Sequence, residues 1–192
     1  MNGSYLLRRM KEADLDVVLR WRNSDRIREN MYTDRHITME EHSRWYTTNQ
    51  YTRASDCSIF EIDGQSMGFI NFTRFDPQNQ SCHWGFYVGD PQAPRGSGSI
   101  MGSLGLEHCF ENLRMRKCFG EAFAFNAASI AFHRKLGFRE EGSLRKQIWK
   151  NGRYEDVLTF ILSTEEWFRI KNELHSKIFN VPFVVDEGGG DG

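Results

Sequence analysis

The 192-residue sequence lacks several features that mark specialised classes of protein. It contains no apolar run long enough to cross a bilayer, so no membrane-spanning helix is predicted. Residues 1–10 contain no apolar signal-peptide core, and we therefore expect a cytoplasmic protein that does not bind membranes. The net charge of -1 gives no overall basic field, which argues against nucleic acid as a partner.

Cysteine is sparse, with four residues and no C-x-x-C pair. Cys57, Cys82, Cys109 and Cys118 each lie in or near an apolar run. We therefore expect buried free thiols, and we predict no zinc or other metal site.

The rest of the composition is that of an ordinary soluble globular protein, with 39% hydrophobic and 27% charged residues. The length suits one domain whose core is large enough to fold alone. We place this domain at residues 1–175 and a C-terminal tail at residues 176–192. The Gly- and Asp-rich end of the tail, residues 187–192, is predicted to be disordered.

Hydrophobic spacing organises the N-terminal third. It predicts a strand over residues 5–8, a helix over residues 15–22 and a second helical segment over residues 25–31. The capping-box pattern Thr38–Glu41 predicts the start of another helix. One face of this helix carries Met39, His42 and Trp45.

The remaining chain alternates strands and helices. The strands are predicted over residues 58–62, 67–74, 82–88, 117–125, 145–150 and 153–162. Asp63-Gly64 and Asn151-Gly152 predict hairpin turns. Helices are predicted from Gly98 to about Leu113, after Asn126 and from Thr164. This order predicts a mixed α/β (α+β) fold, in which the helix from Gly98 makes a right-handed crossover between two parallel strands.

The loop Ala93-Pro94-Arg95-Gly96-Ser97-Gly98-Ser99 follows an apolar strand and opens a helix. The unpaired N–H groups at a helix N-terminus attract phosphate, and glycine lets the backbone approach it closely. Taken alone the Gly-x-Gly is a weak signal, because a simple connecting turn explains it as well.

A second motif follows the strand over residues 117–125. Asn126, Ser129 and His133 are separated by three and four residues, so they share one helical face. Gly137 is suited to the left-handed conformation that ends a helix, with Phe138 packing behind it.

In this order the two motifs resemble those of the GCN5-related N-acetyltransferase (GNAT) superfamily. The resemblance covers the chain from Tyr5 to about Trp167. It implies a single-domain GNAT fold, with a mixed, mostly antiparallel sheet and a central splayed pair of parallel strands. It also implies acetyl-CoA-dependent N-acetyltransferase activity, with acetyl-CoA as cosubstrate and no metal.

In the family the first motif holds the pyrophosphate of acetyl-CoA. The family pattern Gln/Arg-x-x-Gly-x-Gly/Ala fits from Arg95 or from Ala93, and we prefer Ala93 because it places both glycines. The Asn126 position commonly bonds the pantetheine arm. The resemblance thus implies as cosubstrate-binding residues Val88, Arg95, Gly96, Ser97, Gly98, Ser99, Asn126 and Ser129.

The resemblance also implies a catalytic arrangement. A backbone amide near Val88 is expected to polarise the thioester carbonyl. His133 occupies the position of the family tyrosine that protonates the departing thiolate, so we predict that it is the catalytic acid. The alternative is that His133 packs in the core and that water or the substrate ammonium supplies the proton. His83, Glu121 and His42 are all candidates to accept the amine proton, directly or through water.

The N-terminal third carries the elements expected to select the acceptor. Trp21-Arg22-Asn23, Met31-Tyr32 and the pair His42/Trp45 look like the array of the N-acetyltransferases of pseudaminic acid biosynthesis. These act on the 4-amino group of UDP-4-amino-4,6-dideoxy-N-acetyl-altrosamine in flagellin glycosylation. A nucleotide sugar needs a stacking surface, a cationic diphosphate site and an apolar rim. The expected substrate-binding residues are Arg22, Met31, Tyr32, His42, Trp45, His83, Trp84 and Tyr87.

Two alternatives stay open. An acetyltransferase for the N-terminal amine of a (ribosomal) protein would use the same cleft for a peptide, although such a site should be open and acidic. A non-catalytic acyl-CoA-binding module would explain a histidine at position 133. Met31, Met39 and Trp45, each taken singly, are equally well explained as core. A homodimer formed through an exposed strand near the C-terminus also stays open.

Overall fold

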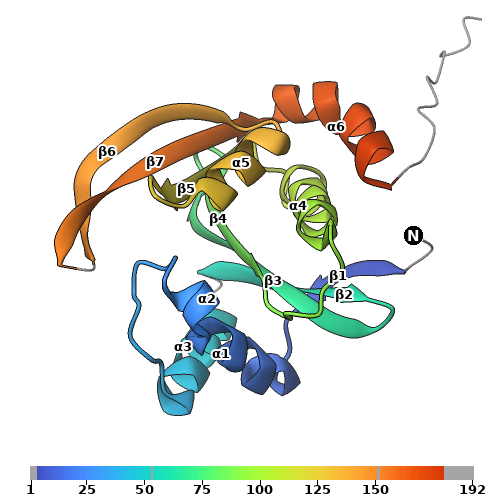
Figure 1. Cartoon of the computed structure of the whole chain (residues 1–192). Coiled ribbons are helices and arrows are strands. Elements are labelled where there is room, and N and C mark those ends of the chain that lie inside the picture. The colour runs from blue at the N-terminus through green and yellow to red at the C-terminus, as the bar shows by residue number, and fades with distance from the viewer. Residues whose placement is uncertain (1–3, 53, 151, 180–192) are drawn as a thin grey trace, which may run out of the picture.

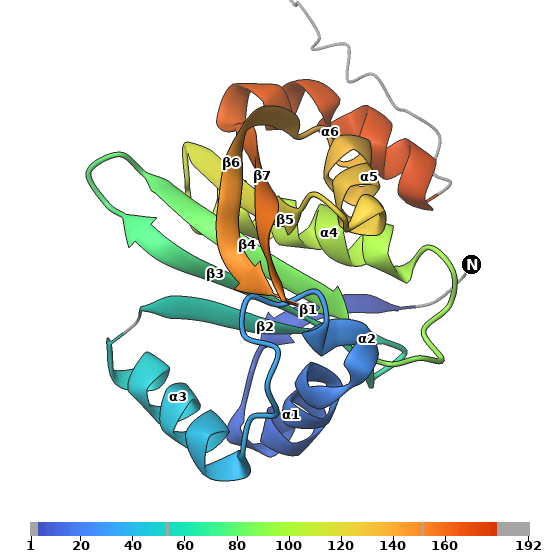
Figure 2. The same cartoon turned by 60° about the vertical axis from the view of Figure 1, so that its left-hand side comes forward.

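The computed structural model describes residues 4–52, 54–150 and 152–179, and its centre is a seven-stranded sheet. The strand order is β1-β2-β3-β4-β5-β7-β6 (Figures 1 and 2). The strands are β1 Tyr5–Arg9, β2 Ser55–Ile62, β3 Gln65–Asp76, β4 Ser81–Val88, β5 Lys117–Phe123, β6 Arg139–Lys150 and β7 Arg153–Ser163. The helices are α1 Leu15–Asn23, α2 Asp25–Arg28, α3 Met39–Thr52, α4 Ser97–Glu107, α5 Ala127–Lys135 and α6 Thr164–Phe179.

The sheet is mixed, as the sequence predicts. Neighbouring strands pair antiparallel except β4 and β5, which are parallel and joined through α4. The expected mixed, mostly antiparallel sheet with a central parallel pair is therefore confirmed.

Both predicted hairpins form, because their turn residues accept a left-handed backbone. At the first turn the φ angles of Asp63 and Gly64 are 50° and 76°, which suits a tight two-residue hairpin. At the second turn Gly152 has a φ of 78°, and Asn151 lies outside the described residues. The second hairpin is longer than expected, since β6 begins at Arg139.

The two faces of the sheet bury separate cores. Along β3, Phe69 faces a small core shared with α1, whereas Ile70 faces a larger core beneath α4 and α6. Figures 1 and 2 show α1, α2 and α3 on one side of the sheet and α4, α5 and α6 on the other. The functional residues of the two sides therefore meet only where the sheet opens.

Local signals at the helix ends are also confirmed. Thr38 Oγ1 accepts the Glu41 amide at 3.2 Å and Glu41 Oε2 accepts the Thr38 amide at 3.0 Å, so the predicted capping box starts α3. The helix expected to end near Leu113 consists of α4 and a π-helical turn, His108–Asn112. The last helix continues to Phe179, and the predicted disordered end, residues 187–192, lies outside the described residues.

The four cysteines are free thiols. Cys82, Cys109 and Cys118 are fully buried, with their sulfur atoms within 4.8 Å of one another, whereas Cys57 is half-buried. Burial raises the pKa of the Cys118 thiol. None of the helices in the described part of the chain has the length and apolarity that a bilayer crossing needs.

Candidate active site

The parallel strands β4 and β5 stay paired over only a short distance. The pairing runs from Ser81↔Lys117 to His83↔Phe119, although β4 continues to Val88. Beyond this point the strands separate. Their separation opens the sheet and leaves backbone groups of β4 facing a cleft.

The Val88 amide is one of these groups. The Gly89 amide donates to the Met67 carbonyl at 2.8 Å, so it faces β3. Alternation along a strand then directs the amide of Val88 away from β3, into the separation. The Val88 carbonyl points to the same side, where it accepts Arg26 Nη2 at 3.0 Å. The Val88 amide thus lies where a developing oxyanion could be stabilised.

A cleft of about 350 Å³ lies at this separation, between the end of β4, the first turn of α4, β5 and the start of α5. Four of the predicted cosubstrate residues line it, namely Val88, Gly98, Asn126 and Ser129. Phe132 also lines it, and its role was missed because an apolar helix residue reads as core. Asn126 caps α5, with its Oδ1 accepting the Ser129 amide at 3.0 Å.

The other residues of the glycine loop lie around the start of α4. Gly96 is its N-cap in a left-handed conformation, with a φ of 96°. The amide and hydroxyl of Ser97 both donate to the Pro94 carbonyl, and Arg95 is exposed. Ser99 Oγ accepts Lys135 Nζ at 2.7 Å, which places a cation beside the first turn of the helix.

His133 lies in the core and does not line this cleft. Its side chain is 1% exposed and its ring stacks on Phe160, with the ring centroids 4.6 Å apart. Nε2 accepts Trp84 Nε1–H at 3.2 Å, and Nδ1 donates to the Ser129 carbonyl at 2.8 Å. Burial lowers the pKa of His133 to about 4. This geometry fits the packing alternative and not a proton donor that faces the thiolate.

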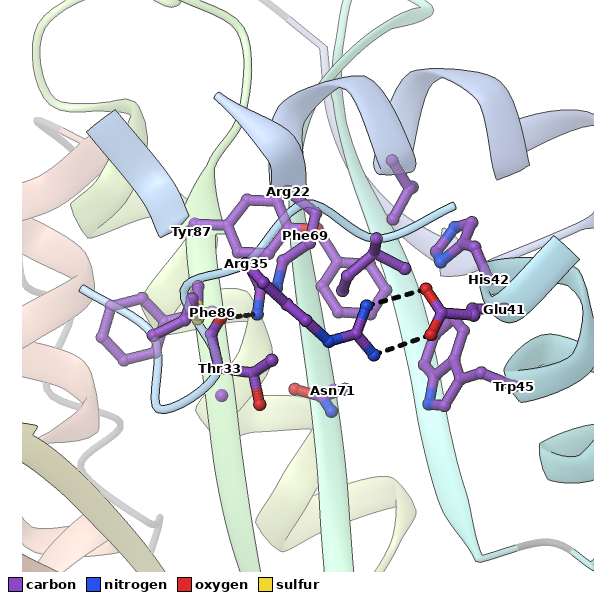
Figure 3. A pocket seen from close by; sticks show the side chains of 14 residues that line it. Arg22, Thr33, Arg35, Glu41, His42, Trp45, Phe69, Asn71, Phe86 and Tyr87 are labelled. Atoms are coloured by element: carbon purple, nitrogen blue, oxygen red, sulfur yellow. Dashed lines mark hydrogen bonds and ion pairs between the residues drawn. The ribbon is translucent and has the colours of Figure 1, made fainter. Parts of the chain in front are cut away.

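A second pocket, of about 490 Å³, opens on the other side of β4 (Figure 3). Its walls are α1, the segment of residues 29–38 between α2 and α3, α3 itself, and strands β3 and β4. Five of the predicted substrate-binding residues line it: Arg22, Met31, His42, Trp45 and Tyr87. Gly85, Phe86, Tyr87 and Met31 line both spaces, so the cleft and the pocket meet at β4.

Two side-chain nitrogen atoms in this pocket have no hydrogen-bond partner among the described residues. Arg22 donates through Nη2 to the Thr33 carbonyl at 2.5 Å, while its Nη1 is buried and unpartnered. His42 is 5% exposed, and its Nε2 is likewise unpartnered. Burial lowers the pKa of His42, and Arg22 lowers it further. A lowered pKa favours the neutral imidazole, in which one ring nitrogen carries a lone pair that can accept a hydrogen bond.

An ion pair closes one side of the pocket. Arg35 binds both carboxylate oxygens of Glu41, at 2.7 and 2.9 Å, as the dashed lines in Figure 3 show. Hydrogen bonds from Arg35 and the Thr38 amide lower the pKa of Glu41 to about 2. The pocket thus carries two guanidinium groups against one carboxylate that is already paired. Arg35 was missed because a single arginine in an irregular segment has no sequence signature.

The structure places the other three expected substrate residues outside this pocket. The Tyr32 hydroxyl donates to Glu121 Oε2 at 2.7 Å, on the part of β5 that has left β4. Arg74 donates to Glu121 Oε1 at 3.0 Å, and His83 Nδ1 lies 3.6 Å from the same oxygen. Trp84 is 6% exposed and lines the cleft above His133. Of the three candidate bases, Glu121 and His83 therefore lie together, and His42 lies apart from them in the pocket of Figure 3.

Comparisons with known proteins agree with this geometry. Residues 5–139 match the family described as the acetyltransferase (GNAT) domain. The chain is 33% identical over 109 residues to the SPbeta prophage-derived uncharacterized N-acetyltransferase YokL of Bacillus subtilis, which covers 56% of this chain and 60% of that protein. It is 21% identical over 159 residues to the spermidine N(1)-acetyltransferase of Vibrio cholerae, 82% of this chain and 91% of that protein.

A solved structure is similar throughout the fold. The crystal structure of spermidine N-acetyltransferase from Vibrio cholerae in complex with CoA and spermine superposes with a TM-score of 0.81 at 18% identity. The match covers 85% of this chain and 98% of that one.

Proposed function

We propose that this chain, which belongs to the GNAT acetyltransferase family and is an acetyl-CoA-dependent N-acetyltransferase, acetylates a sugar amine linked to a nucleoside diphosphate. The acetyl donor occupies the cleft between α4 and α5, and the acceptor occupies the pocket of Figure 3. The observation that carries the proposal is the unpartnered Nη1 of Arg22 in that pocket.

A buried guanidinium donor without a partner is costly, and a phosphate oxygen is the acceptor that suits it best. Arg35 also lines this pocket, where Glu41 balances its charge, so the positive charge without a carboxylate partner is that of Arg22. A diphosphate between these two groups would satisfy the unpartnered donor. The neutral His42 Nε2 would accept a hydroxyl or amide proton of the sugar.

The apolar part of the pocket suits the rest of such a substrate. His42 stacks on Trp45 with centroids 5.1 Å apart, and Phe69 stacks on Tyr87 at 5.3 Å, which forms an aromatic floor. Uracil is flat and would stack there, while Met31 provides an apolar rim for a 6-deoxy methyl group. The specific acceptor that we propose is UDP-4-amino-4,6-dideoxy-N-acetyl-altrosamine, in the biosynthesis of pseudaminic acid for flagellin glycosylation.

The charge of the pocket argues against a polyamine, although spermidine is the substrate named for several similar proteins. Unit charges of like sign about 4 Å apart repel by about 4 kcal/mol near a protein surface. An ammonium group of spermidine that entered this pocket would meet the buried guanidinium of Arg22, and Glu41, the only carboxylate among the described residues that line the pocket, is already bound to Arg35.

The arrangement also suggests how the chain promotes the transfer. The amine reaches the acetyl group across β4, where the two spaces meet, and the Val88 amide stabilises the oxyanion. Glu121, with His83 beside it, would accept the amine proton from the side of β5, and the CoA thiolate that leaves when the oxyanion collapses would take up a proton from water.

The test offers the purified full chain three acceptors side by side with acetyl-CoA: UDP-4-amino-4,6-dideoxy-N-acetyl-altrosamine, spermidine and a peptide with a free N-terminus. Mass spectrometry detects the acetylated product. We expect efficient acetylation of the sugar only. Efficient acetylation of spermidine or peptide without the sugar would overturn the proposal, and turnover of none of them would favour a binding module.

A further inference from the structure

The segment of residues 29–38, here called the acceptor loop, forms one wall of the acceptor pocket. Thr33, Arg35 and Ile37 of this loop line the pocket, and Met31 lines both the pocket and the cleft. The loop contains no helix or strand. Its position must therefore depend on contacts with other parts of the chain.

Nearby helices supply most of these contacts. Asn23 brackets Ile37, donating to its carbonyl at 2.8 Å and accepting its amide at 2.9 Å. Arg22 donates to the Thr33 carbonyl at 2.5 Å, and Arg28 Nη1 donates to the Asp34 carbonyl at 2.8 Å.

One contact comes from the opposite end of the chain. Lys150, the last residue of β6, directs its Nζ to the Met31 carbonyl at 3.1 Å and to Asp34 Oδ2 at 2.9 Å. The same ammonium lies 5.7 Å from the centroid of the Phe123 ring. Figures 1 and 2 both show the end of the β6–β7 hairpin beside this loop.

The burial of Lys150 is unusual for its type. Its side chain is 1% exposed, whereas lysine is almost never fully buried unless it is paired. Its hydrogen bond is the leading cause of the lowered pKa of Asp34. Both partners of the ammonium belong to the acceptor loop, so this burial serves the position of that loop.

We propose that Lys150 is a positioning residue that holds the acceptor loop against the sheet and thereby completes the acceptor pocket. The inference rests on the proposed function, in that the pocket of Figure 3 receives the acceptor. Lys150 lies beyond residues 5–139, the part that matches the family domain. The acceptor site is therefore finished by a hairpin that the matched region does not contain, and β6 contributes to acceptor choice.

The test compares Lys150→Met with Lys150→Arg and with Lys146→Met, in the full chain. Lys146 lies on the same strand but is exposed, so its substitution is the matched control. For Lys150→Met we expect the acceptor KM to rise about 10- to 100-fold, because a charged hydrogen bond to a pocket wall is lost. The KM for acetyl-CoA should stay within about twofold, since Asn30 and Met31 are the only residues of the acceptor loop among those that line the cosubstrate cleft, and the contacts of its glycine loop and of Asn126 are unchanged. Lys150→Arg restores the positive charge and should recover part of the loss.

Amide hydrogen exchange of residues 31–37 is measured on the same proteins, because it does not depend on the identity of the acceptor. Faster exchange in Lys150→Met alone supports the inference, even where no tested acceptor is acetylated and the proposed function fails. Unchanged exchange, or an equal rise in both KM values, overturns it. If Lys150→Met does not fold, Asp34→Ala removes the half-exposed partner instead, with a smaller rise in acceptor KM expected.

Discussion

The cosubstrate cleft and the acceptor pocket lie on either side of β4, yet they are built in different ways. The cleft is formed by a backbone amide, a glycine and the capped start of a helix, in Val88, Gly98 and Asn126. The pocket is formed by long charged and aromatic side chains, among them Arg22 and Trp45. Backbone groups can stay in place while side chains vary, so the cleft suits a donor common to a family and the pocket suits an acceptor of this chain.

The two sites also differ in how far apart in the sequence their parts lie. The motif residues of the cleft come from two short segments, around residues 96–99 and 126–129. The acceptor loop is held by Asn23, Arg28 and Lys150, so its geometry depends on the whole fold. A substitution in the cleft should therefore weaken binding of acetyl-CoA alone, and a substitution in the pocket should weaken binding of the acceptor alone.

The largest effect is expected at Gly98. A Cβ built there meets Phe132 and Val88 at 3.6 Å, which is ordinary contact, so Gly98→Ala should fold and bind acetyl-CoA nearly normally. The two additional methyl groups of Gly98→Val project into the cleft and should weaken CoA binding by roughly 100-fold or more. Calorimetric titration with CoA measures this. Unchanged CoA affinity in a folded Gly98→Val protein would contradict the assignment of the cleft.

Local signals explain why several elements of the fold could be predicted from the sequence. Asp63-Gly64, the Thr38 capping box and the glycine loop each act within a few residues, and each forms as expected. The role of His133 could not be decided in the same way. The prediction placed His133 on a helix, as observed. Whether its side chain faces a cleft or the core depends on Trp84 of β4 and Phe160 of β7, which are distant in the sequence.

The next largest effect is expected at Arg22 on the acceptor side. Arg22→Met keeps an unbranched aliphatic stem and removes the charged donor, which should raise the acceptor KM roughly 10- to 100-fold. Steady-state kinetics with each substrate varied in turn provide the measurement. An increase in spermidine acetylation by the variant would agree with repulsion by Arg22 in the native pocket. A rise in the KM for acetyl-CoA instead would break the comparison between the two sites.

The acceptor side shows what sequence patterns do not contain. Arg35 and Lys150 are ordinary charged residues in the sequence, and only their long-range partners give them a place in the site. Tyr32 was expected in the acceptor pocket, whereas its hydrogen bond to Glu121 holds it on the side of β5. When charged and aromatic residues are irregularly spaced, the sequence shows which residue types are present but not which of them are in contact. Those contacts are determined by the tertiary fold.

A smaller effect is expected at Trp45. Trp45→Leu keeps an apolar residue in the small core but removes the stacking surface, so the acceptor KM should rise by about 5- to 10-fold. Tyr51→Leu on the same helix is the control, because Tyr51 is 84% exposed. A nucleotide without the sugar should also lose affinity for the Trp45 variant. If the wild type and Trp45→Leu bind UDP equally well, uracil does not stack on Trp45.

The smallest effect on catalysis is expected at His133, where the comparison predicts a change in stability and not in turnover. His133→Phe should retain turnover within about twofold when chemistry is rate-limiting, whereas loss of a general acid would cost about 10²- to 10⁴-fold. The pKa of His133 in the folded protein, about 4, lies below the ordinary value of 6.5. Between pH 6.5 and pH 4 the unfolded chain therefore binds a proton that the folded protein does not, so the free energy of unfolding decreases as the pH is lowered. The wild type should lose about 3 kcal/mol through this group between pH 6.5 and pH 4, and the variant should lack that part of the slope. Urea unfolding of both proteins across this pH range measures the difference. If the free energy of unfolding changes equally with pH in both proteins, His133 is not a buried residue with a lowered pKa.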